Sequence, residues 1–428
     1  MRRRSVSTEG PGRHRSDATA QPAVPAEAGS FDDRGASVAV DVIEPEDVAV
    51  PPPVVVKPRR RLRRRILQTT LAILLVCAAL VGYGVSAALS QPGNDKASAK
   101  IAEWARDHHL GSMVNWMEKQ SYTPPKVNGT PDAHSPLVAP PEEPAPASVT
   151  ASKLASYGPQ LPGTVTPPAT PPLATEGQWQ MLAATPDGHP AMAATFMRPD
   201  AEHTSYTAGV VWWNPALVKA ALHPGTLDPG GDWSQLTYLP PAQRSGVLAA
   251  FNSGFRLDDS KGGYYADGRV AKPLVDGAAS MVFYQDGTMT IGQWGRDIAM
   301  SANIAAVRQN LALIVEDGAM VPGVQTNDGN AWGATLGNAK YVWRSGIGTR
   351  PDGGMVYVAG NRLTAGTLAD LLVRAGSVRG MELDINPYWT SFVTYMSGTP
   401  TNLLPDMEHA ADRYDTPSSR DFVSLATR

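Results

Sequence analysis

The chain has 428 residues, with 37 Lys and Arg against 40 Asp and Glu, a formal net charge of −3 and a single cysteine. A charge so close to neutrality excludes the binding of a polyanion through an overall positive surface, so no nucleic-acid partner is expected. The length is sufficient for one large domain with a substantial core and additional flanking segments.

Residues 1–65 are predicted to form a disordered cytoplasmic tail. Up to residue 58 they are rich in Pro, Ala, Ser and acidic residues and contain a single aromatic, Phe31, so they cannot bury enough apolar surface to fold alone. Lys57 and six arginines then form a basic cluster directly ahead of an apolar segment. Positive charge on this flank predicts a cytoplasmic N-terminus.

The apolar segment Ile66–Leu89 is predicted to be a single transmembrane helix whose partner is the lipid bilayer of a cell membrane. As a helix it would be about 36 Å long, against roughly 30 Å for a hydrocarbon core. A cleaved signal peptide is the alternative, because the sequence Val85 to Ala87 could serve a peptidase. The segment exceeds the usual apolar region of a signal and begins far from Met1, so an uncleaved anchor is favoured, with everything after Ser90 extracellular.

Residues 90–122 are predicted to form a short helical stalk. Ile101 and Trp104 fall at helical spacing, Gly111 interrupts the pattern, and a second apolar cluster follows at Met113–Met117. Two short helices in this place could pack on the outer leaflet, dimerise or dock on the main domain.

Residues 123–175 are predicted to be a Pro-rich linker, because repeated prolines favour extended chain over a packed element. The remainder, 176–428, is predicted to be one α+β ectodomain. Asp-Gly turn signals between strand-like runs favour a twisted, mixed or mostly antiparallel sheet with a few packed helices. The clearest helical pattern runs from Thr364 to Ala375, and shorter ones are expected near Ala302–Gln309 and Pro215–Ala221.

The cysteine and histidine content limits the cofactor chemistry of the ectodomain. Cys77 lies within the predicted membrane helix, so disulfides, cysteine catalysis and thiolate metal sites are excluded beyond it. The histidines show no metal-ligand spacing, and no motif indicates a cofactor. A divalent cation, or simple loop solubility, could explain four irregularly spaced aspartates in Gly-rich sequence, Asp258, Asp259, Asp267 and Asp276.

The segment from Arg344 to Phe392 is predicted to carry the functional site. Arg344 stands beside Gly346 and Gly348, which let backbone N–H groups approach a ligand closely, so this place suits an anion. A Pro-Asp-Gly turn at 351–353 predicts a hairpin with the apolar strand that follows. In the later strand, Met381 to Asn386, side chains two apart share a face, so Glu382, Asp384 and Asn386 are expected to project together.

Four segments, in this order, resemble motifs of the phosphodiester glycosidase family. That family typically carries Asn-Gly-Gly-Phe-Phe, Arg-Thr-Ala-Ile-Gly, a helix start of the form Gly-Asn/Arg-x-x-Thr-x-x-x-Leu-Ala, and Leu-Asp-Gly-Gly-Gly-Ser. The corresponding segments here are Asn252–Arg256, Arg344–Gly348, Asn361–Ala369 and Leu383–Ser391. Their spread covers about a third of the chain, and four ordered segments are more specific than any one alone. In the last segment Ile-Asn-Pro stands where the family has three glycines.

The resemblance implies hydrolysis at the anomeric carbon of a sugar phosphodiester. The leaving phosphate monoester, with a second pKa of about 6, departs with little protonation, so the reaction mainly needs a base or nucleophile and positive charge for the phosphate. Asp384 or Glu382 is the candidate for the first role, and Arg344, with the amides near Gly346 and Gly348, for the second. Alternatively, Arg344 forms a buried ion pair with one of these carboxylates and holds loops in place.

Asn252, Gly254, Asn386 and Trp389 are further candidates for substrate binding. The Asn252 amide, at the end of the strand 247–251, could orient a sugar hydroxyl or phosphate, or could close a turn instead. Trp389 could stack on a sugar ring or pack in the core.

The sequence thus predicts a membrane-anchored extracellular hydrolase of a sugar-1-phosphodiester in a cell-wall polymer or exported glycan. The alternative, from a different class, is a non-catalytic module on the same fold that binds a glycan or assists cell-envelope assembly. An open pocket at Glu382, Asp384 and Arg344 would favour chemistry, and a closed, fully paired cluster would favour scaffolding.

Overall fold

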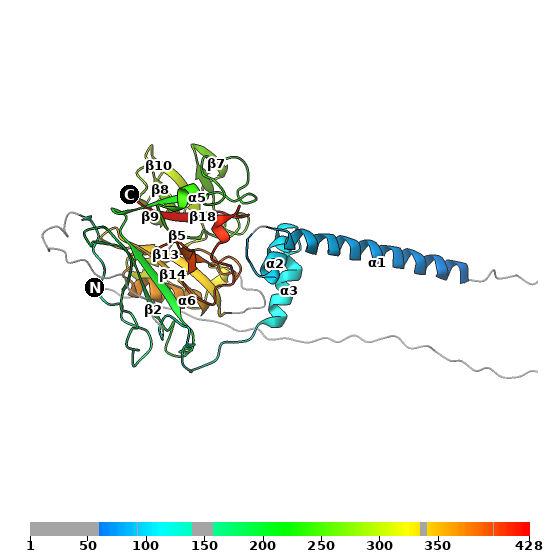
Figure 1. Cartoon of the computed structure of the whole chain (residues 1–428), viewed down its shortest axis with the longest axis horizontal. Coiled ribbons are helices and arrows are strands. Elements are labelled where there is room, and N and C mark those ends of the chain that lie inside the picture. The colour runs from blue at the N-terminus through cyan, green and yellow to red at the C-terminus, as the bar shows by residue number, and fades with distance from the viewer. Residues whose placement is uncertain (1–59, 92, 139–156, 334–339, 397) are drawn as a thin grey trace, which may run out of the picture. The chain divides into compact units, whose positions relative to one another are not determined.

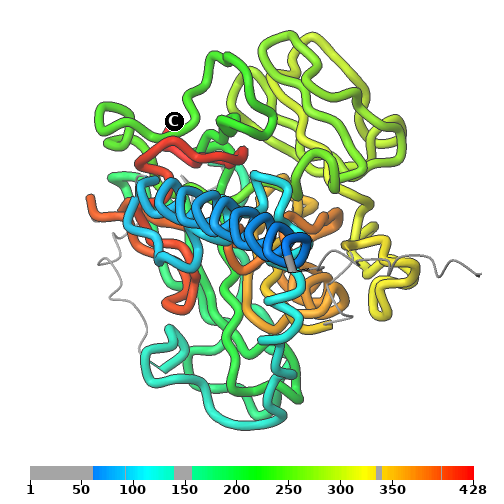
Figure 2. The backbone as a smooth tube through the Cα atoms, turned by 90° about the vertical axis from the view of Figure 1, so that its right-hand side faces the viewer, coloured from blue at the N-terminus to red at the C-terminus, as the bar shows by residue number. Residues whose placement is uncertain are grey.

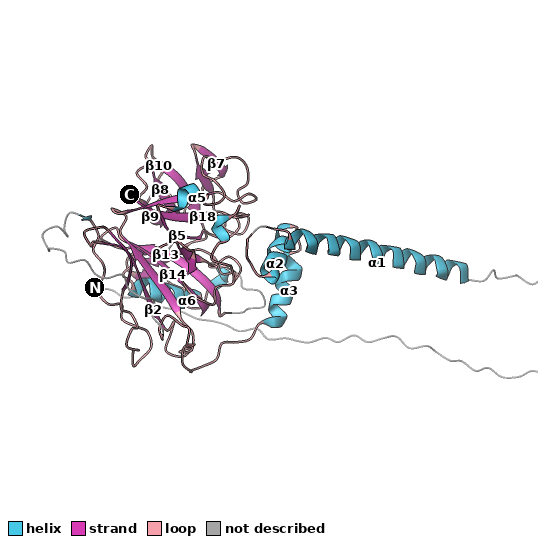
Figure 3. Cartoon of the chain, viewed as in Figure 1, coloured by secondary structure: helices cyan, strands magenta, loops and turns pink. Residues whose placement is uncertain are grey.

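The protein is described from a computed structural model that covers residues 60–91, 93–138, 157–333, 340–396 and 398–428 (Figure 1). The predicted cytoplasmic tail up to residue 59 and the linker residues 139–156 lie outside the described residues. Strands predominate over helices in the main domain, as Figure 3 shows, and the α+β class is confirmed.

The N-terminal helix α1 (Arg60–Leu89) contains the predicted membrane span. Among the described residues it is the one helix long and apolar enough to cross a membrane, with a mean hydropathy of 2.3 over an 18-residue window. Large apolar side chains along it, such as Leu74 and Leu75, are exposed, as expected for a helix whose solvent is lipid. Cys77 is also exposed on this helix.

Two short helices, α2 (Ala97–Asp107) and α3 (Gly111–Ser121), confirm the helical pattern expected after the membrane segment. They form a hairpin in which Ala102, Ala105 and Val114 pack together, with Tyr388 of the main domain against them. Of the three arrangements considered for these helices, docking on the main domain is observed, and it leaves Met113, Trp116 and Met117 of α3 exposed.

Part of the Pro-rich segment packs against the domain rather than standing free. The side-chain amide of Asn214 donates to the carbonyls of Tyr157 and Pro159, at 2.7 and 2.8 Å. Val165 and Ala169 are buried. The packed domain therefore includes residues ahead of 176, which the sequence assigns to the linker.

The largest sheet has eight strands in the order β1-β2-β3-β14-β13-β15-β11-β12, with antiparallel pairing. The strands are β1 (Gln180–Ala184), β2 (Pro190–Met197), β3 (Ala208–Trp213), β11 (Leu313–Glu316), β12 (Ala319–Met320), β13 (Val342–Thr349), β14 (Met355–Leu363) and β15 (Arg379–Glu382). The predicted hairpin through the 351–353 turn is confirmed as the β13–β14 pair.

The predicted helix in the site segment is also confirmed, as α6 (Ala365–Arg374). The Thr364 hydroxyl caps it by accepting the Thr367 amide at 3.0 Å. Its apolar face, which includes the fully buried Leu368 and Leu371, packs on the eight-stranded sheet.

Two five-stranded antiparallel sheets complete the domain. One has the order β7-β6-β10-β8-β9 and comprises β6 (Tyr264–Ala266), β7 (Arg269–Lys272), β8 (Ala279–Tyr284), β9 (Met289–Gln293) and β10 (Ile304–Gln309); its chain is yellow-green in Figure 2. The other has the order β17-β16-β5-β18-β4 and comprises β4 (Val218–His223), β5 (Val247–Asn252), β16 (Phe392–Thr394), β17 (Thr401–Asn402) and β18 (Phe422–Thr427). Short helical turns are α5 (Pro241–Arg244), η2 (Asp328–Asn330) and η4 (Arg413–Asp415).

Two expected helices are wrong, because both segments are strands. Ala302–Gln309 contains β10, which lies between β6 and β8 and is largely buried, so its apolar residues form a run rather than an alternation. Pro215–Ala221 overlaps β4, where Val218, Ala220 and Leu222 are buried at every second position.

Aromatic packing joins the eight-stranded sheet to the sheet that contains β5. Phe251 on β5 lies with ring-centroid distances of 6.0 Å to Trp213, 5.1 Å to Tyr357 and 5.8 Å to Phe392. Contacts of this kind stabilise a core beyond the area they bury. They hold the end of β5 close to β13–β15, where the site residues lie.

Candidate functional site

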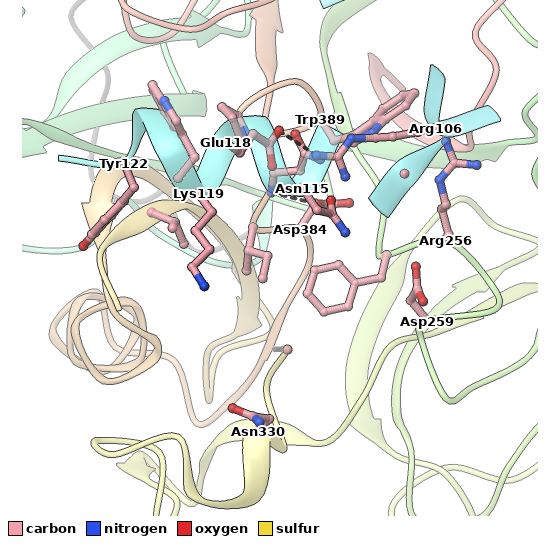
Figure 4. A pocket seen from close by; sticks show the side chains of 18 of the residues that line it. Arg106, Asn115, Glu118, Lys119, Tyr122, Arg256, Asp259, Asn330, Asp384 and Trp389 are labelled. Carbon is pink, nitrogen blue, oxygen red and sulfur yellow. Dashed lines mark hydrogen bonds and ion pairs between the residues drawn. The ribbon is translucent and has the colours of Figure 1, made fainter. Parts of the chain in front are cut away.

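A cavity of about 1010 Å³ lies where the α2–α3 hairpin meets the main domain (Figure 4). Its walls come from the hairpin, the segments after β5 and β15, the loop around η2, the start of β13, the end of β14 and the part of the chain before β18. Six cations and four carboxylates line it: Arg106, Lys119, Arg256, Lys261, Arg362 and Arg420, with Glu118, Asp259, Asp384 and Glu408. A volume of this size accommodates a ligand larger than a single sugar ring.

Asp384 lies on the cavity wall, two residues beyond the end of β15. Its Oδ1 accepts the backbone N–H of Asn386 at 2.9 Å, and its Oδ2 accepts the guanidinium of Arg420 at 2.8 Å. The residue is 2% exposed. Asp384 is therefore held in one orientation by a turn and by a cation.

Arg420, which sequence reasoning missed, supplies the cation beside Asp384. Its Nη2 also donates to the carbonyl of Gly254 at 2.6 Å. Burial disfavours its charge, but the carboxylates of Asp384, Asp228 and Asp421 outweigh this and raise the pKa of the guanidinium. Within the described residues, its buried Nε has no hydrogen-bond partner.

Trp389 lines the same cavity beneath two arginines. The Arg420 guanidinium carbon lies 4.2 Å from the Trp389 ring centre, and that of Arg413 lies 4.8 Å from it. Both distances are within the range of cation–π attraction. The indole is thus stacked by protein cations, and residue 389 is 3% exposed.

Arg344 and Glu382, the other predicted catalytic residues, form an ion pair with each other. Arg344 Nε donates to the Leu363 carbonyl at 3.1 Å, and both side chains are buried. Burial raises the pKa of Glu382, against the opposing pull of Arg344. Neither residue belongs to the cavity lining, so this pair has the closed geometry of the alternative in which Arg344 holds loops in place.

Glu382 and Asp384 therefore do not line one cavity together as the alternation of a strand predicts, although the charge of Asp384 still contributes to the raised pKa of Glu382. β15 ends at Glu382, so the two-residue period no longer applies at Asp384. Each carboxylate has its own arginine, and only the Asp384–Arg420 pair reaches the cavity.

Gly346 and Gly348, predicted to receive an anion, lie in β13 under other parts of the protein. A Cβ at Gly346 would be 3.0 Å from the Met381 carbonyl oxygen, and one at Gly348 would be 2.4 Å from Oγ of Ser377. Other residues of the protein, and not a ligand, therefore approach these glycines closely. Neither glycine lines the cavity.

Asn252 uses its side chain entirely within the protein. Its Nδ2 donates to the Ser253 carbonyl and to Ser345 Oγ, both at 2.9 Å. Its Oδ1 accepts from the hydroxyl of Tyr357 and the backbone N–H of Ser391, both at 3.1 Å. These bonds fix the loop that carries Gly254, whose carbonyl binds Arg420.

Asn386 does line the cavity, and its Oδ1 accepts the Tyr388 amide at 2.9 Å. Of the nine site residues predicted from the sequence, Asp384, Asn386 and Trp389 share this wall. Tyr388 packs on the α2–α3 hairpin.

A buried polar network behind the cavity wall was also missed. Asn310 donates to the carbonyls of Glu382 and Leu383 at 2.8 and 2.9 Å, and it accepts the Phe255 amide at 3.2 Å. It thereby joins the segment after β5 to the segment after β15. Its position directly after β10, at a strand end, was the available sequence signal.

Charged pairs continue this network. Arg308 binds Asp421 at 2.6 Å, and both side chains have no exposed surface. Burial and the nearby charge of Asp421 raise the pKa of Asp228, whose carboxylate accepts the Leu257 amide at 2.9 Å. An Arg-Asp sequence directly ahead of the last apolar strand marks Arg420 and Asp421, but no spacing links it to Asp384.

The hairpin wall is attached to the domain by polar contacts. Asp107 at the end of α2 pairs with Arg256, and burial raises the pKa of Asp107 in spite of this partner. Asp95 pairs with His409 at 2.9 Å; burial opposes its charge, but the bond from His409 prevails and lowers the pKa of Asp95 to about 2. In Figure 4, Asn115 and Lys119 project from α3, with Arg256 and Asp259 on another wall.

The four loop aspartates do not assemble into a metal site. Within the described ranges, no group of three or more His, Cys, Asp or Glu side chains is placed to hold a metal ion. Asp267 instead accepts the amide and hydroxyl of Ser234, at 2.7 and 2.6 Å.

No protein-family model matches the chain, and no curated protein sequence matches it. Among solved structures, the chain is similar to the catalytic domain of zebrafish N-acetylglucosamine-1-phosphodiester alpha-N-acetylglucosaminidase, auto-inhibited by its pro-peptide. The identity is 13% and the TM-score 0.37, over 59% of this chain and 87% of that chain.

Two further structures are similar at the same level. A hypothetical protein from Synechocystis has 11% identity and a TM-score of 0.33, over 56% of this chain and 62% of that chain. A putative exported protein from Burkholderia pseudomallei has 11% identity and a TM-score of 0.29, over 53% of this chain and 75% of that chain. All three TM-scores are below 0.5.

Proposed function

We propose that this protein is a membrane-anchored extracellular hydrolase that cleaves a sugar-1-phosphodiester of a cell-wall polymer or exported glycan. The observation that carries the proposal is the Asp384–Arg420 pair on the wall of a cavity lined by further cations. The residues around this pair form a concave site with a fixed carboxylate, an aromatic ring and positive charge, as carbohydrate phosphate chemistry requires.

In the proposed reaction, the bond between the anomeric carbon and the phosphate oxygen breaks, and Asp384 either takes a proton from the water that attacks this carbon or attacks the carbon itself, after which water hydrolyses the sugar ester. The phosphate monoester leaves with little protonation, so the second requirement is positive charge around its oxygens. Arg420, Lys119 and Arg362, which all line the cavity, supply that charge in place of the enclosed Arg344. Glu382 and Arg344 then support β15 and the segment after it, which carries Asp384.

Membrane anchoring through Ile66–Leu89 belongs to the same proposal. It is supported by the length and hydropathy of α1 and by the basic cluster ahead of the apolar segment. That cluster favours a cytoplasmic N-terminus and an extracellular domain.

The proposal is tested by hydrolysis of an aryl ester of a sugar 1-phosphate with the full chain in detergent. Asp384→Asn is expected to lower kcat/KM by about 100-fold or more, because it removes a base or nucleophile. Asp259→Asn is the matched control, since Asp259 is an exposed aspartate on another wall of the same cavity. Equal turnover by the wild type and the Asp384→Asn variant would exclude catalysis by this site.

The alternative function, a non-catalytic glycan-binding or envelope-assembly module, is favoured by the low exposure of Asp384 and its pairing with Arg420. It predicts that the full chain retains glycans in a pull-down without releasing product. Binding that is lost in a Trp389→Ala variant and retained in Asp384→Asn would support this alternative.

A further inference from the structure

Helix α3 has two faces that differ in what they contact. Asn115 and Glu118 are half-buried and line the cavity, and Val114 packs on α2. On the opposite side, four large apolar residues are 41, 49, 60 and 54% exposed: Leu110, Met113, Trp116 and Met117. We refer to these four residues as the outer face of α3. Their spacing of three and four residues places them along one side of the helix.

The outer face has no partner among the described residues that buries it, and its composition is unusual for a surface in water. A contiguous exposed patch of Leu, Met and Trp indicates a contact with another surface. The sequence from His108 to Met117 contains no acidic residue. An apolar face with an indole and without negative charge suits the headgroup layer of a bilayer, where Trp is enriched and anionic lipids are common.

The connection to α1 brings this face within short reach of a membrane. Gly84, near the end of α1, packs against the indole of Trp104 on α2, so closely that an added Cβ would lie 2.4 Å from Cη2. Ala88, in the last turn of α1, is fully buried. Helix α2 therefore packs directly on the end of α1, and α3 begins after a turn of three residues.

We propose that the outer face of α3 lies in the headgroup layer of the membrane that α1 enters. The bilayer is thus the occupant of this face, and the cavity on the other side of α3 stands next to the lipid surface. The inference rests on the membrane anchor of the proposed function, but it does not depend on the reaction. It assigns α3 the role of an interfacial helix that is part of the site wall.

The test uses the full chain in nanodiscs of phosphatidylcholine and phosphatidylglycerol. In a Cys77→Ser background, Met117→Cys carries a nitroxide spin label on the outer face, and Ala302→Cys carries it at an exposed position far along the chain. At residue 117, molecular oxygen is expected to increase the spin relaxation rate of the nitroxide more than a water-soluble nickel chelate does, because oxygen partitions into lipid and the chelate does not. At residue 302 the chelate is expected to dominate.

Each outcome decides a separate point. A chain that does not enter the nanodisc contradicts the anchor itself. A chain that enters, but whose label at 117 is as accessible to the chelate as the label at 302, overturns the interfacial face. Dipolar broadening between labels at 117 would assign the face to a second copy of the chain and would also overturn the proposal. Met113→Cys, one turn earlier on the same face, repeats the measurement if the Met117 variant does not fold.

Discussion

The Arg420 guanidinium donates a 2.8 Å hydrogen bond to Oδ2 of Asp384, although the two residues are 36 positions apart in the sequence. The same Nη2 donates to the Gly254 carbonyl, so one cation joins the segments after β5, after β15 and before β18. A carboxylate this buried needs a partner of opposite charge. The Asp384–Arg420 pair therefore fixes the positions of the three segments at the site, and it sets the charge of the wall that they form.

Replacing Arg420 by lysine is expected to impair hydrolysis. A lysine keeps the charge but cannot reproduce the planar contacts to Asp384, Gly254 and Trp389 at once. We expect kcat/KM on the aryl substrate to fall by about 10-fold or more. Arg413→Lys is the matched control, because Arg413 also lies over Trp389 but donates to the Tyr388 carbonyl instead. Similar losses in both variants would contradict a specific role for Arg420.

Glu382 is expected to make stability depend on pH. Because burial raises its pKa, the folded state binds the proton more tightly than the unfolded state does. Its contribution to the free energy of unfolding is therefore full below the unfolded pKa and declines as pH rises through the folded pKa. The total decline is about 1.4 kcal/mol for each pH unit that separates the folded pKa from the unfolded pKa.

Urea unfolding of the wild type and Glu382→Gln at a series of pH values measures this effect. The free energy of unfolding of the wild type, relative to that of the variant, should decrease with rising pH. A difference that is constant with pH would show that Arg344 offsets the effect of burial, and one that grows with pH would show that Arg344 stabilises the ionised carboxylate more than burial destabilises it.

Arg256→Gln is expected to loosen the α2–α3 hairpin. It leaves the buried carboxylate of Asp107 without its guanidinium, which weakens docking by about 1–3 kcal/mol. Amide hydrogen exchange in α2 and α3 should accelerate while exchange in β13 is unchanged. Arg296→Gln, which breaks the more exposed pair with Glu316, serves as the control. If both variants leave exchange in the hairpin unaltered, other contacts hold it.

Gly348→Ala is expected to destabilise the domain. The new Cβ would lie 2.4 Å from Ser377 Oγ and 2.8 Å from the Arg379 carbonyl oxygen, and overpacking of this kind costs about 1–3 kcal/mol. Gly163→Ala, where nothing lies within 4 Å of the new methyl group, should be close to neutral in the same thermal unfolding measurement. A Gly348→Ala protein of normal stability with weakened substrate binding would instead support the anion-binding role expected from the sequence.

Local chemistry allowed much of the fold to be predicted. The β13–β14 hairpin follows from its Pro-Asp-Gly turn, and α6 follows from its apolar period and the Thr364 cap. Asp384 was found because it belongs to the expected strand Met381–Asn386 and to a segment that resembles a family motif. The helix expected at Ala302–Gln309 failed because a central strand, buried on both faces, loses the alternation that identifies strands.

The partners of the site residues could not be predicted in the same way. Arg420 reaches Asp384 only because β18 pairs with β5, and no sequence pattern encodes that pairing. Arg344 was assigned to the phosphate because a guanidinium beside Gly346 and Gly348 suits an anion, and the sequence did not decide between this role and the ion pair with Glu382 that the structure has. The contribution of α3 to the cavity depends on docking between parts of the chain that the Pro-rich segment separates.

The hairpin wall has a practical consequence for enzymology. Arg106 and Lys119 precede the Pro-rich segment in the sequence, whereas Asp384 and Arg420 follow it. The cavity is therefore complete only when the α2–α3 hairpin docks on the main domain. A trimmed soluble fragment that begins at residue 123 would keep the reactive pair but would have one side missing. Because this side of the cavity would be missing, such a fragment would accept a broader range of substrates than the intact protein does.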